Sequence, residues 1–300
     1  MEDRFAGSLL GLALACALGG RHEGGALGAA VWGALGGVGS AELRWTDDTQ
    51  MALGLARSLV ERKGLDADHL AATWARDADW KRGYGRGARK MLARVRGGED
   101  WRDANRAVFP DGSFGNGAAM RVAPLALWFG ADGPALVEAA RLASSITHAH
   151  PFGVEGGVLV ARATALALTS DLPPDAFLAR LKEGSGDEEF TGRLDAAAAF
   201  LETDPSTRDV AWTLGNSVVA QESAVTAVYC YLRFRDAPFL DLVEFVVALG
   251  GDTDTIGAMA GGMWGARRGA AAQPPDPLSQ LEARDAIENA ARDLYTHRPA

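Results

Sequence analysis

The sequence predicts an all-α fold, and three observations lead to that expectation. Apolar residues recur at spacings of three and four along most of the chain, which is the period of an amphipathic helix. Start signals typical of helices occur at residues 47–50 and 132–134. No segment alternates apolar and polar residues for long enough to demand a strand, although the apolar run 245–249 permits a short one.

The first predicted helix lies near the N-terminus, where Phe5, Leu9, Leu12 and Cys16 follow a 4-3-4 spacing. Two acidic residues precede this apolar stretch, whereas a secretory leader begins with positive charge. The stretch is also too short and too rich in glycine to span a bilayer. We therefore expect residues 5–20 to form a buried helix.

Further helices are expected along the rest of the chain. Met51, Leu55 and Leu59 repeat every fourth residue after Asp47 and Gln50, which have the spacing of a capping box. The other predicted helices are residues 118–128, a helix that starts near Pro134, a helix that ends within residues 144–150, one marked by the stripe of Val218, Val225, Val228 and Leu232, and a glycine-rich helix at 256–265.

The composition is that of a single globular domain covering residues 1–300, because no stretch has the length or composition of a linker. A hydrophobic fraction of 48% is sufficient for a large core, and a net charge of −9 argues against nucleic acid or an anionic membrane as the main partner. The only two cysteines, Cys16 and Cys230, predict core positions, no disulfide framework and a cytoplasmic location.

Two short clusters rich in acids and hydroxyls lie far apart in the chain, at residues 45–50 and 250–255. They carry four carboxylates, and no Cys or His stands beside them, which suits a hard cation such as Mg²⁺, Mn²⁺ or Ca²⁺. Taken alone, the first cluster is explained by helix capping, with Thr46 or Asp47 as the cap and the second acid at the positive end of the dipole. The adjacent Asp47 and Asp48 favour a cation nonetheless, because they repel each other unless a cation or solvent screens them. In the second cluster, capping explains one acid but not two acids and two threonines in an apolar neighbourhood. If the fold joins the clusters, we expect a metal-dependent hydrolase.

Glycine-rich segments at 111–121 and 82–87 are the next candidates, because successive backbone N–H groups can form a nest for a diphosphate. Phe114 is expected either to stack on a nucleobase or to anchor the loop in the core. The arginines of the second segment offer cations for the same phosphates.

Three further side chains are candidates of a less specific kind. Glu23 lies in a glycine-rich loop and is either a solvated carboxylate or a general acid or base near the metals. His148 and His150 follow a helix and are either partners of its dipole or site residues, and the lack of Cys or acid at ligand spacing argues against zinc.

A phosphohydrolase is an alternative, because an apolar strand followed by Asp-x-Asp resembles the nucleophile motif of haloacid-dehalogenase-like phosphatases. Residues 247–254 fit that pattern superficially. In that family the motif stands near the N-terminus with others downstream. Only a short segment without lysine or a second acidic pair follows here, so this alternative ranks low.

Taken in order, these motifs resemble the ADP-ribosylglycohydrolase family over nearly the whole chain. The matching segments are Phe5–Gly11 with Ala17–Gly19, Trp45–Gln50, Arg82–Gly85, Gly115–Arg121, Thr147–His148 and Gly250–Thr255. One departure is Ala15-Cys16, where the family often has Gly-Asp.

The resemblance implies an orthogonally packed multi-helix domain with two Mg²⁺ ions, replaceable by Mn²⁺ or Ca²⁺, at the base of an ADP-ribose cleft. By position, it assigns metal ligation to Thr46, Asp47, Asp48, Asp252, Asp254 and Thr255. It assigns substrate binding to Gly85, Gly112, Ser113, Phe114, Gly115, Asn116 and His148. Glu23 matches the glutamate near the scissile bond, with Glu42 as a competing candidate.

We therefore expect hydrolysis of the C1″ bond between ADP-ribose and an acceptor, foremost a protein arginine or serine side chain. Glu23 is the expected general acid or base. The alternative of another class is a catalytically silent, metal-containing ADP-ribose-binding module. An ADP-ribosylated protein or small-molecule conjugate is the expected partner, and the acceptor and oligomeric state stay open.

Overall fold

A computed structural model describes residues 1–22 and 42–299, and within these ranges every regular element is a helix. Two isolated bridges, Leu43 with Leu281 and Gly115 with Val219, are the only β-type pairings that the described ranges contain. The all-α prediction is confirmed. The elements are α1 (Glu2–Gly20), α3 (Asp47–Arg62), α4 (Ala67–Asp77), η1 (Trp80–Arg82), α5 (Arg86–Arg96), α6 (Trp101–Val108), η2 (Asn116–Arg121), α7 (Ala123–Phe129), α8 (Pro134–Ser145), α9 (Pro151–Thr169), α10 (Pro174–Lys182), α11 (Glu188–Thr203), α12 (Thr207–Thr213), α13 (Ala220–Phe234), α14 (Phe239–Leu249), α15 (Thr253–Arg268), η3 (Ala270–Ala272), α16 (Pro275–Ser279) and α17 (Arg284–His297).

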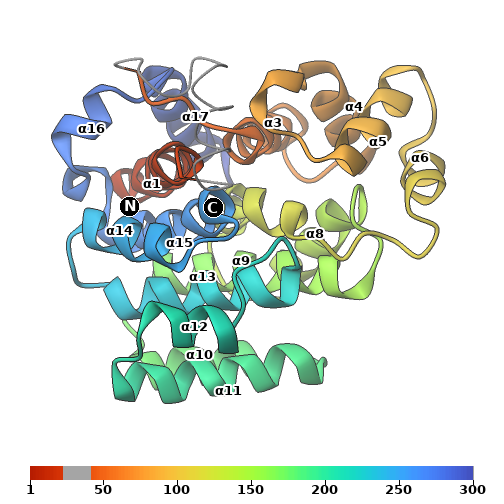
Figure 1. Cartoon of the computed structure of the whole chain (residues 1–300). Coiled ribbons are helices and arrows are strands. Elements are labelled where there is room, and N and C mark those ends of the chain that lie inside the picture. Colours follow the sequence, from red (N-terminus) through yellow and green to blue (C-terminus); the bar gives the residue numbers. More distant parts are fainter. Residues whose placement is uncertain (23–41, 300) are drawn as a thin grey trace.

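Helices α1 and α15 lie side by side near the middle of the molecule (Figure 1). Helices α3 to α6 lie to one side of α1 and α15, and α10 to α12 form the opposite end. The longest central helices are almost wholly buried, because short and apolar side chains surround them on all faces.

Helices α1 and α15 pack antiparallel with their backbones in contact. Gly7 and Gly11 of α1 face Gly265 and Gly261 of α15, and a Cβ placed on Gly265 would lie 1.9 Å from the carbonyl oxygen of Gly7. Only glycine permits so close an approach. The contact continues to the end of α1, where the Thr253 hydroxyl donates to the carbonyl of Gly19 at 2.9 Å. The start of α15, with its acids, is thereby held beside the end of α1.

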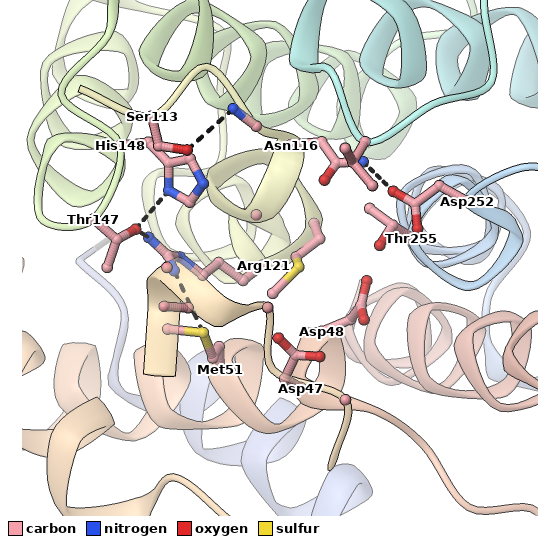
Figure 2. Close-up of a pocket in the computed structure, with 18 of the residues that line it drawn as sticks. Asp47, Asp48, Met51, Ser113, Asn116, Arg121, Thr147, His148, Asp252 and Thr255 are labelled. Atoms are coloured by element: carbon pink, nitrogen blue, oxygen red, sulfur yellow. Dashed lines mark hydrogen bonds between the residues drawn. The ribbon is translucent and has the colours of Figure 1, made fainter. Parts of the chain in front are cut away.

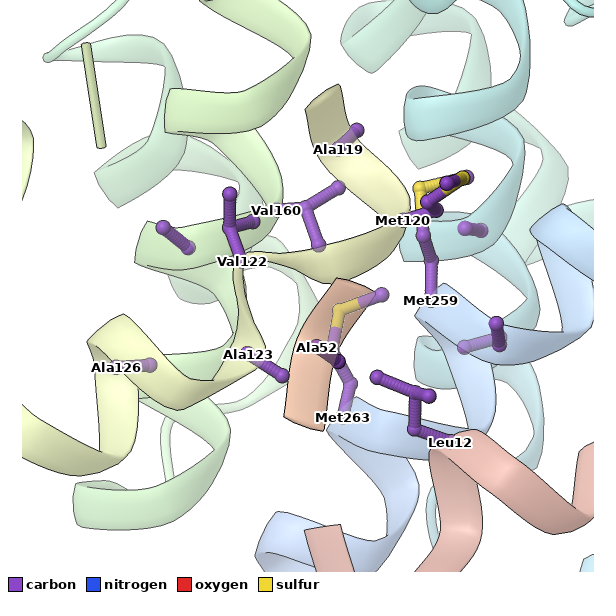
Figure 3. Packing of buried hydrophobic residues seen from close by; sticks show 14 of the residues in the cluster. Leu12, Ala52, Ala119, Met120, Val122, Ala123, Ala126, Val160, Met259 and Met263 are labelled. Atoms are coloured by element: carbon purple, nitrogen blue, oxygen red, sulfur yellow. The ribbon is translucent and has the colours of Figure 1, made fainter. Parts of the chain in front are cut away.

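Behind the acidic clusters, small and flexible apolar side chains fill the core (Figure 3). Met120 of η2 and Met259 and Met263 of α15 are all buried, among alanines of α3 and α7. Methionine fills irregular gaps between closely spaced helices because its side chain is unbranched and flexible. This core joins α1, α3, η2, α7, α9 and α15 into one support for the site.

Helix α9 is long and apolar enough to cross a membrane by length and composition alone. However, 83% of its most apolar window is buried inside the protein, which is the pattern of a core helix. The predicted buried helix at the N-terminus is confirmed as α1, and Phe5, Leu9, Leu12 and Cys16 are all buried.

Some local predictions are wrong. Residues 245–249 are the last turn of helix α14 and form no strand, because Phe239, Leu242, Val243 and Val246 continue the same buried stripe at helical spacing. This result also removes the strand that the phosphohydrolase alternative requires. The predicted helix 118–128 is two elements, η2 and α7, because Pro124 in the first turn of α7 starts a new helix.

The predicted stripe on α13 is shorter than expected. Val225, Val228 and Leu232 are buried, but Val218 precedes the helix and is 61% exposed. The glycine-rich helix predicted at 256–265 is longer than expected, since α15 spans Thr253–Arg268.

Candidate active site

A pocket of about 310 Å³ opens where the two acidic clusters meet the glycine-rich loops. Figure 2 shows the acids gathered on one side of this pocket and Ser113, Thr147 and His148 on the other. The described lining residues are Asp47, Asp48, Met51, Gly83, Gly85, Gly87, Ala88, Phe109, Ser113, Gly115, Asn116, Gly117, Met120, Arg121, Thr147, His148, Val218, Asp252, Asp254 and Thr255. The fold therefore joins the two clusters, as the sequence analysis required.

The first acidic cluster is held by a buried contact with α1. Thr46 precedes α3, and its hydroxyl donates to the carboxylate of Asp48. The Cys16 sulfur lies 3.0 Å from the same hydroxyl and accepts the Thr46 backbone N–H at 3.2 Å. Thr46 thus lies behind the pocket, where it orients Asp48, and it is not among the lining residues.

The second acidic cluster opens α15. The backbone N–H of Asp252 donates to the carbonyl of Asn216 at 2.9 Å, and the side-chain amide of Asn116 donates to the Asp252 carboxylate. Asp254 accepts the N–H of Thr255 at 2.8 Å. All three lining residues of this cluster, Asp252, Asp254 and Thr255, are buried.

Helix capping does not account for these acids. The N-cap residues of α3 and α15 are Thr46 and Asp252, and neither side chain makes a capping hydrogen bond. The capping-box expectation for Asp47 and Gln50 is also wrong, because the Gln50 amide oxygen accepts from the backbone of Asp79 and the hydroxyl of Tyr84. The positive ends of two helix dipoles nonetheless face the carboxylates and stabilise their charge.

The donor set fits a hard cation. One carboxylate oxygen of Asp48 is buried and has no hydrogen-bond partner, and no Lys, Arg or His of the described ranges forms an ion pair with Asp48 or Asp252. Burial raises the pKa of Asp48 to about 6, against a lowering by the hydrogen bond from Thr46, and the charge of Asp252 raises it further. Buried carboxylates of this kind are costly unless a positive charge compensates them.

Within the described residues, no three Asp, Glu, His or Cys side chains converge tightly enough to enclose a metal ion alone. Hydroxyl and amide oxygens and water would therefore complete the coordination. Mg²⁺ binds in this manner, since it keeps several waters and takes only one or two carboxylates at a site.

The opposite side of the pocket is built from the loop before η2. Ser113, Gly115 and Asn116 line it, and the Ser113 hydroxyl accepts the N–H of Gly115 at 3.3 Å. A Cβ on Gly117 would lie 2.9 Å from the His148 ring, so glycine is needed for the loop to pass the imidazole.

Two predicted substrate residues lie outside this lining. Gly112 has a φ of +83°, and a Cβ there would lie 2.1 Å from the backbone nitrogen of His150, so its role is to let two backbones pass. Phe114 is 52% exposed, and its ring lies edge-on to His150 at 5.8 Å. The alternative that Phe114 anchors the loop in the core is therefore wrong.

A buried cation lies at the base of the pocket. Arg121 is 1% exposed, stacks on Trp74 at 3.9 Å and donates to the Thr147 hydroxyl at 2.6 Å. That hydroxyl lies 2.7 Å from Nδ1 of His148. Burial lowers the pKa of Arg121 to about 9, and burial together with Arg121 lowers that of His148 to about 3. The imidazole is therefore neutral at physiological pH.

Comparison with known proteins identifies the family. The sequence profile of the ADP-ribosylglycohydrolase family matches residues 1–300. The chain belongs to the ADP-ribosylglycohydrolase family. It is therefore a glycohydrolase enzyme.

Individual relatives of this ADP-ribosylglycohydrolase include ADP-ribosylhydrolase ARH3 from Bos taurus, which is 33% identical over 88% of this chain and 81% of the bovine protein. The Homo sapiens ARH3 protein is 32% identical over 84% of this chain and 78% of its own length. A solved structure described as an ADP-ribosylglycohydrolase-related protein complex superposes with a TM-score of 0.74 at 29% identity, covering 99% of both chains.

The glycine segment of this glycohydrolase at 82–87 differs from expectation in its arginine. Gly83, Gly85 and Gly87 line the pocket, but Arg82 stacks on Trp45 at 3.6 Å and is paired with Glu282 at 2.6 Å. Arg82 is thus a structural clamp on the segment that carries the first acidic cluster, and the expectation that it offers its charge to phosphates is wrong.

The catalytic candidate Glu23 lies outside the described residues. Its competitor Glu42 is described, is exposed, and is not among the residues that line the pocket. Arg121 and Thr147 were not predicted as site residues, although both stand in the family motifs 115–121 and 147–148, because nothing local in the sequence shows that their side chains meet.

Proposed function

We propose that the protein releases ADP-ribose from an ADP-ribosylated acceptor by hydrolysis of the C1″ glycosidic bond, with the help of bound divalent cations. One observation carries the proposal. Carboxylates from the start of α3 and the start of α15 line the same pocket as residues of the loop 113–117, so the proposed cation site and the proposed diphosphate cradle would adjoin. Membership of the family and the likeness to ADP-ribosylhydrolases support the substrate class.

The residues proposed to hold the cations are Asp47, Asp48, Asp252, Asp254 and Thr255, which line the pocket, with Thr46 orienting Asp48 from behind. Two Mg²⁺ ions, or Mn²⁺ or Ca²⁺ in their place, match this oxygen-only donor set. When bound, such ions orient a sugar through its hydroxyls and lower the pKa of water.

The protein's own groups would bind the remainder of the substrate. The N–H groups and hydroxyl of the loop at Ser113, Gly115 and Asn116 are proposed to hold the diphosphate, with His148 beside them and Gly85 across the pocket. Two exposed rings are proposed to offer apolar faces to the adenine: Phe109, at 39%, which lines the pocket, and Phe114, at 52%, which lies between the lining residues Ser113 and Gly115.

Cleavage of the glycosidic bond passes through an oxocarbenium-like state and requires a group that moves a proton at the leaving atom. We assign this role to Glu23 on the sequence alone. The acceptor is proposed to be a protein arginine or serine side chain, and the protein is proposed to act in the cytoplasm.

The test is release of free ADP-ribose from arginine- and serine-linked substrates in the presence of Mg²⁺ or EDTA. We expect release from one linkage with Mg²⁺ and none with EDTA. Asp252→Ala should lower turnover by orders of magnitude, whereas Asp103→Asn on the exposed face of α6 should not. Unchanged activity and Mg²⁺ affinity in the Asp252 variant would refute the cation assignment.

The Glu23 assignment has a separate test. Glu23→Gln should abolish turnover and leave the affinity for free ADP-ribose and for Mg²⁺ nearly unchanged, because the amide keeps the size of the side chain but cannot exchange a proton. Normal turnover by the Glu23→Gln variant would show that another group moves the proton. No release from either substrate by folded, Mg²⁺-loaded protein would refute the proposed function.

A further inference from the structure

The ring of His148 has two nitrogens in different surroundings. Nδ1 lies 2.7 Å from the Thr147 hydroxyl, on the buried side. Nε2 has no hydrogen-bond partner within the described ranges and lies near Gly115 and Gly117, toward the pocket. The tautomer therefore decides whether the pocket meets an N–H donor or a bare acceptor.

The Thr147 hydroxyl is the group that distinguishes the two tautomers. Arg121 donates to it at 2.6 Å, and a guanidinium can only donate, so one lone pair of the Thr147 oxygen is already occupied. The single hydroxyl hydrogen then needs an acceptor, and Nδ1 of His148 is the one within reach.

The tautomer with its proton on Nδ1 would leave one buried hydrogen without a hydrogen-bond acceptor. If Nδ1 carried the proton, it and Arg121 would both donate to the same oxygen, and the hydroxyl hydrogen would have no acceptor. Thr147 is 5% exposed, so water does not readily replace that partner. An unsatisfied buried polar hydrogen costs roughly 1–3 kcal/mol.

We propose that Arg121 and Thr147 are positioning residues, which hold His148 in the tautomer with its proton on Nε2 and so present a neutral N–H donor to the ligand. The charge of the buried guanidinium disfavours a second proton on the ring. The ligand atom at this place must then be an acceptor oxygen. That the oxygen belongs to the diphosphate of ADP-ribose rests on the proposed function.

The tautomer is measurable in the protein without any ligand. Two-bond ¹H–¹⁵N correlation spectra distinguish protonated from unprotonated ring nitrogens, and the His148 signals are assigned by their loss in His148→Asn. We expect a neutral ring with Nε2 protonated at pH 7. A ring with Nδ1 protonated would overturn the proposal.

A matched pair of variants tests whether the Thr147 hydroxyl selects the tautomer of His148. Thr147→Val keeps the size of the side chain and removes the hydroxyl, so we expect a mixture of tautomers and about a tenfold weaker affinity for ADP-ribose. Thr147→Ser keeps the hydroxyl and should restore both the single tautomer and the affinity. A Val variant with the wild-type tautomer and affinity would overturn the role of Thr147.

The contribution of Arg121 is tested by Arg121→Met, which removes the donor and fills similar space against Trp74 and Met51. We expect the Thr147 hydroxyl to rotate and the tautomer to become mixed, whereas an unchanged single tautomer would refute the role of Arg121. If this variant does not fold, the two Thr147 variants still test whether the hydroxyl selects the tautomer of His148. Failure of the wild-type protein to bind ADP-ribose would refute the proposed function and leave the tautomer measurement intact.

Discussion

The side-chain amide of Asn116 donates a hydrogen bond to the carboxylate of Asp252, across 136 residues of sequence. The same nitrogen lies 3.0 Å from the Ser223 hydroxyl, so the amide is held from two sides. This contact ties the glycine loop to the second acidic cluster. The proposed diphosphate cradle and the proposed cation site are thereby parts of one rigid unit.

The first prediction concerns this tie. Asn116→Ala should weaken Mg²⁺ binding by about 10–100-fold, because the loss of a group that orients a ligating carboxylate has that effect in metal sites. Ser223→Ala is the matched control, since it leaves the bond from Asn116 to Asp252 in place. Titration calorimetry with Mg²⁺ measures both. Equal affinities for the two variants would show that Asn116 does not orient Asp252.

The second prediction concerns the exposed ring of Phe114. Phe114→Ala should weaken ADP-ribose binding by roughly tenfold, since stacking of a base on an aromatic ring contributes about 1–3 kcal/mol. Mg²⁺ affinity should not change. Trp212→Ala removes an even more exposed ring, at 90%, which belongs to helix α12 and not to the loop that lines the pocket, and it should have no effect on either ligand. The idea fails if the two variants bind ADP-ribose alike.

The third prediction concerns the contact between α1 and α15. A Cβ on Gly261 would lie 2.4 Å from the carbonyl oxygen of Gly11, so Gly261→Ala must separate the helices and should cost about 1–3 kcal/mol of unfolding free energy. Gly192→Ala is the control, because Gly192 is exposed on α11 with open space around it. That change should be neutral or stabilise by up to about 1 kcal/mol. Urea denaturation decides, and equal stabilities would refute the packing argument.

The fourth prediction concerns acid pH. Burial, together with Arg121, lowers the pKa of His148 to about 3 in the folded state, against about 6.5 for an unfolded histidine. The unfolded state therefore binds the extra proton first, so the stability that His148 contributes is complete above about pH 6.5 and falls as the pH approaches 3. At pH 5 the loss attributable to this group is about 2 kcal/mol.

The measurement for this prediction is the unfolding free energy of the wild type and of His148→Gln between pH 7 and pH 5. The wild type should lose more stability over that range than the variant. His297→Gln, at an exposed position of α17, should follow the wild-type curve. Parallel curves for the wild type and His148→Gln would contradict the lowered pKa.

Local sequence features predicted the helices well, and they failed where two structures share the same local pattern. The apolar residues of α1 recur at helical spacing alone, so the pattern predicts only a buried helix, which is what forms. The apolar run at the end of α14 is compatible with both a buried helix and a short strand, because periodicity alone does not distinguish the two in so short a run. Only the contacts of Phe239, Leu242 and Val246 with the rest of the protein select the helix.

The candidate site divides in the same way. The acids were identifiable because two clusters of carboxylates and hydroxyls, with no Cys or His beside them in the sequence, supply the oxygen ligands that a hard cation prefers. The contact of Cys16 with Thr46 was not identifiable, since a small buried cysteine has no local signature. Arg82 was wrongly predicted as a site residue, because its partner Glu282 lies near the other end of the chain and no local pattern shows the pair.

The sequence by itself determined the helical class, the family and the acids on which the proposed chemistry rests, because each is carried by composition or short-range spacing. The tertiary structure decided which groups meet: Asn116 with Asp252, and Arg121 with Thr147 and His148. The physical reason is range. Helix period acts over a few residues, whereas hydrogen bonding and burial act between atoms that only the packing of α1, α3, η2 and α15 brings within reach.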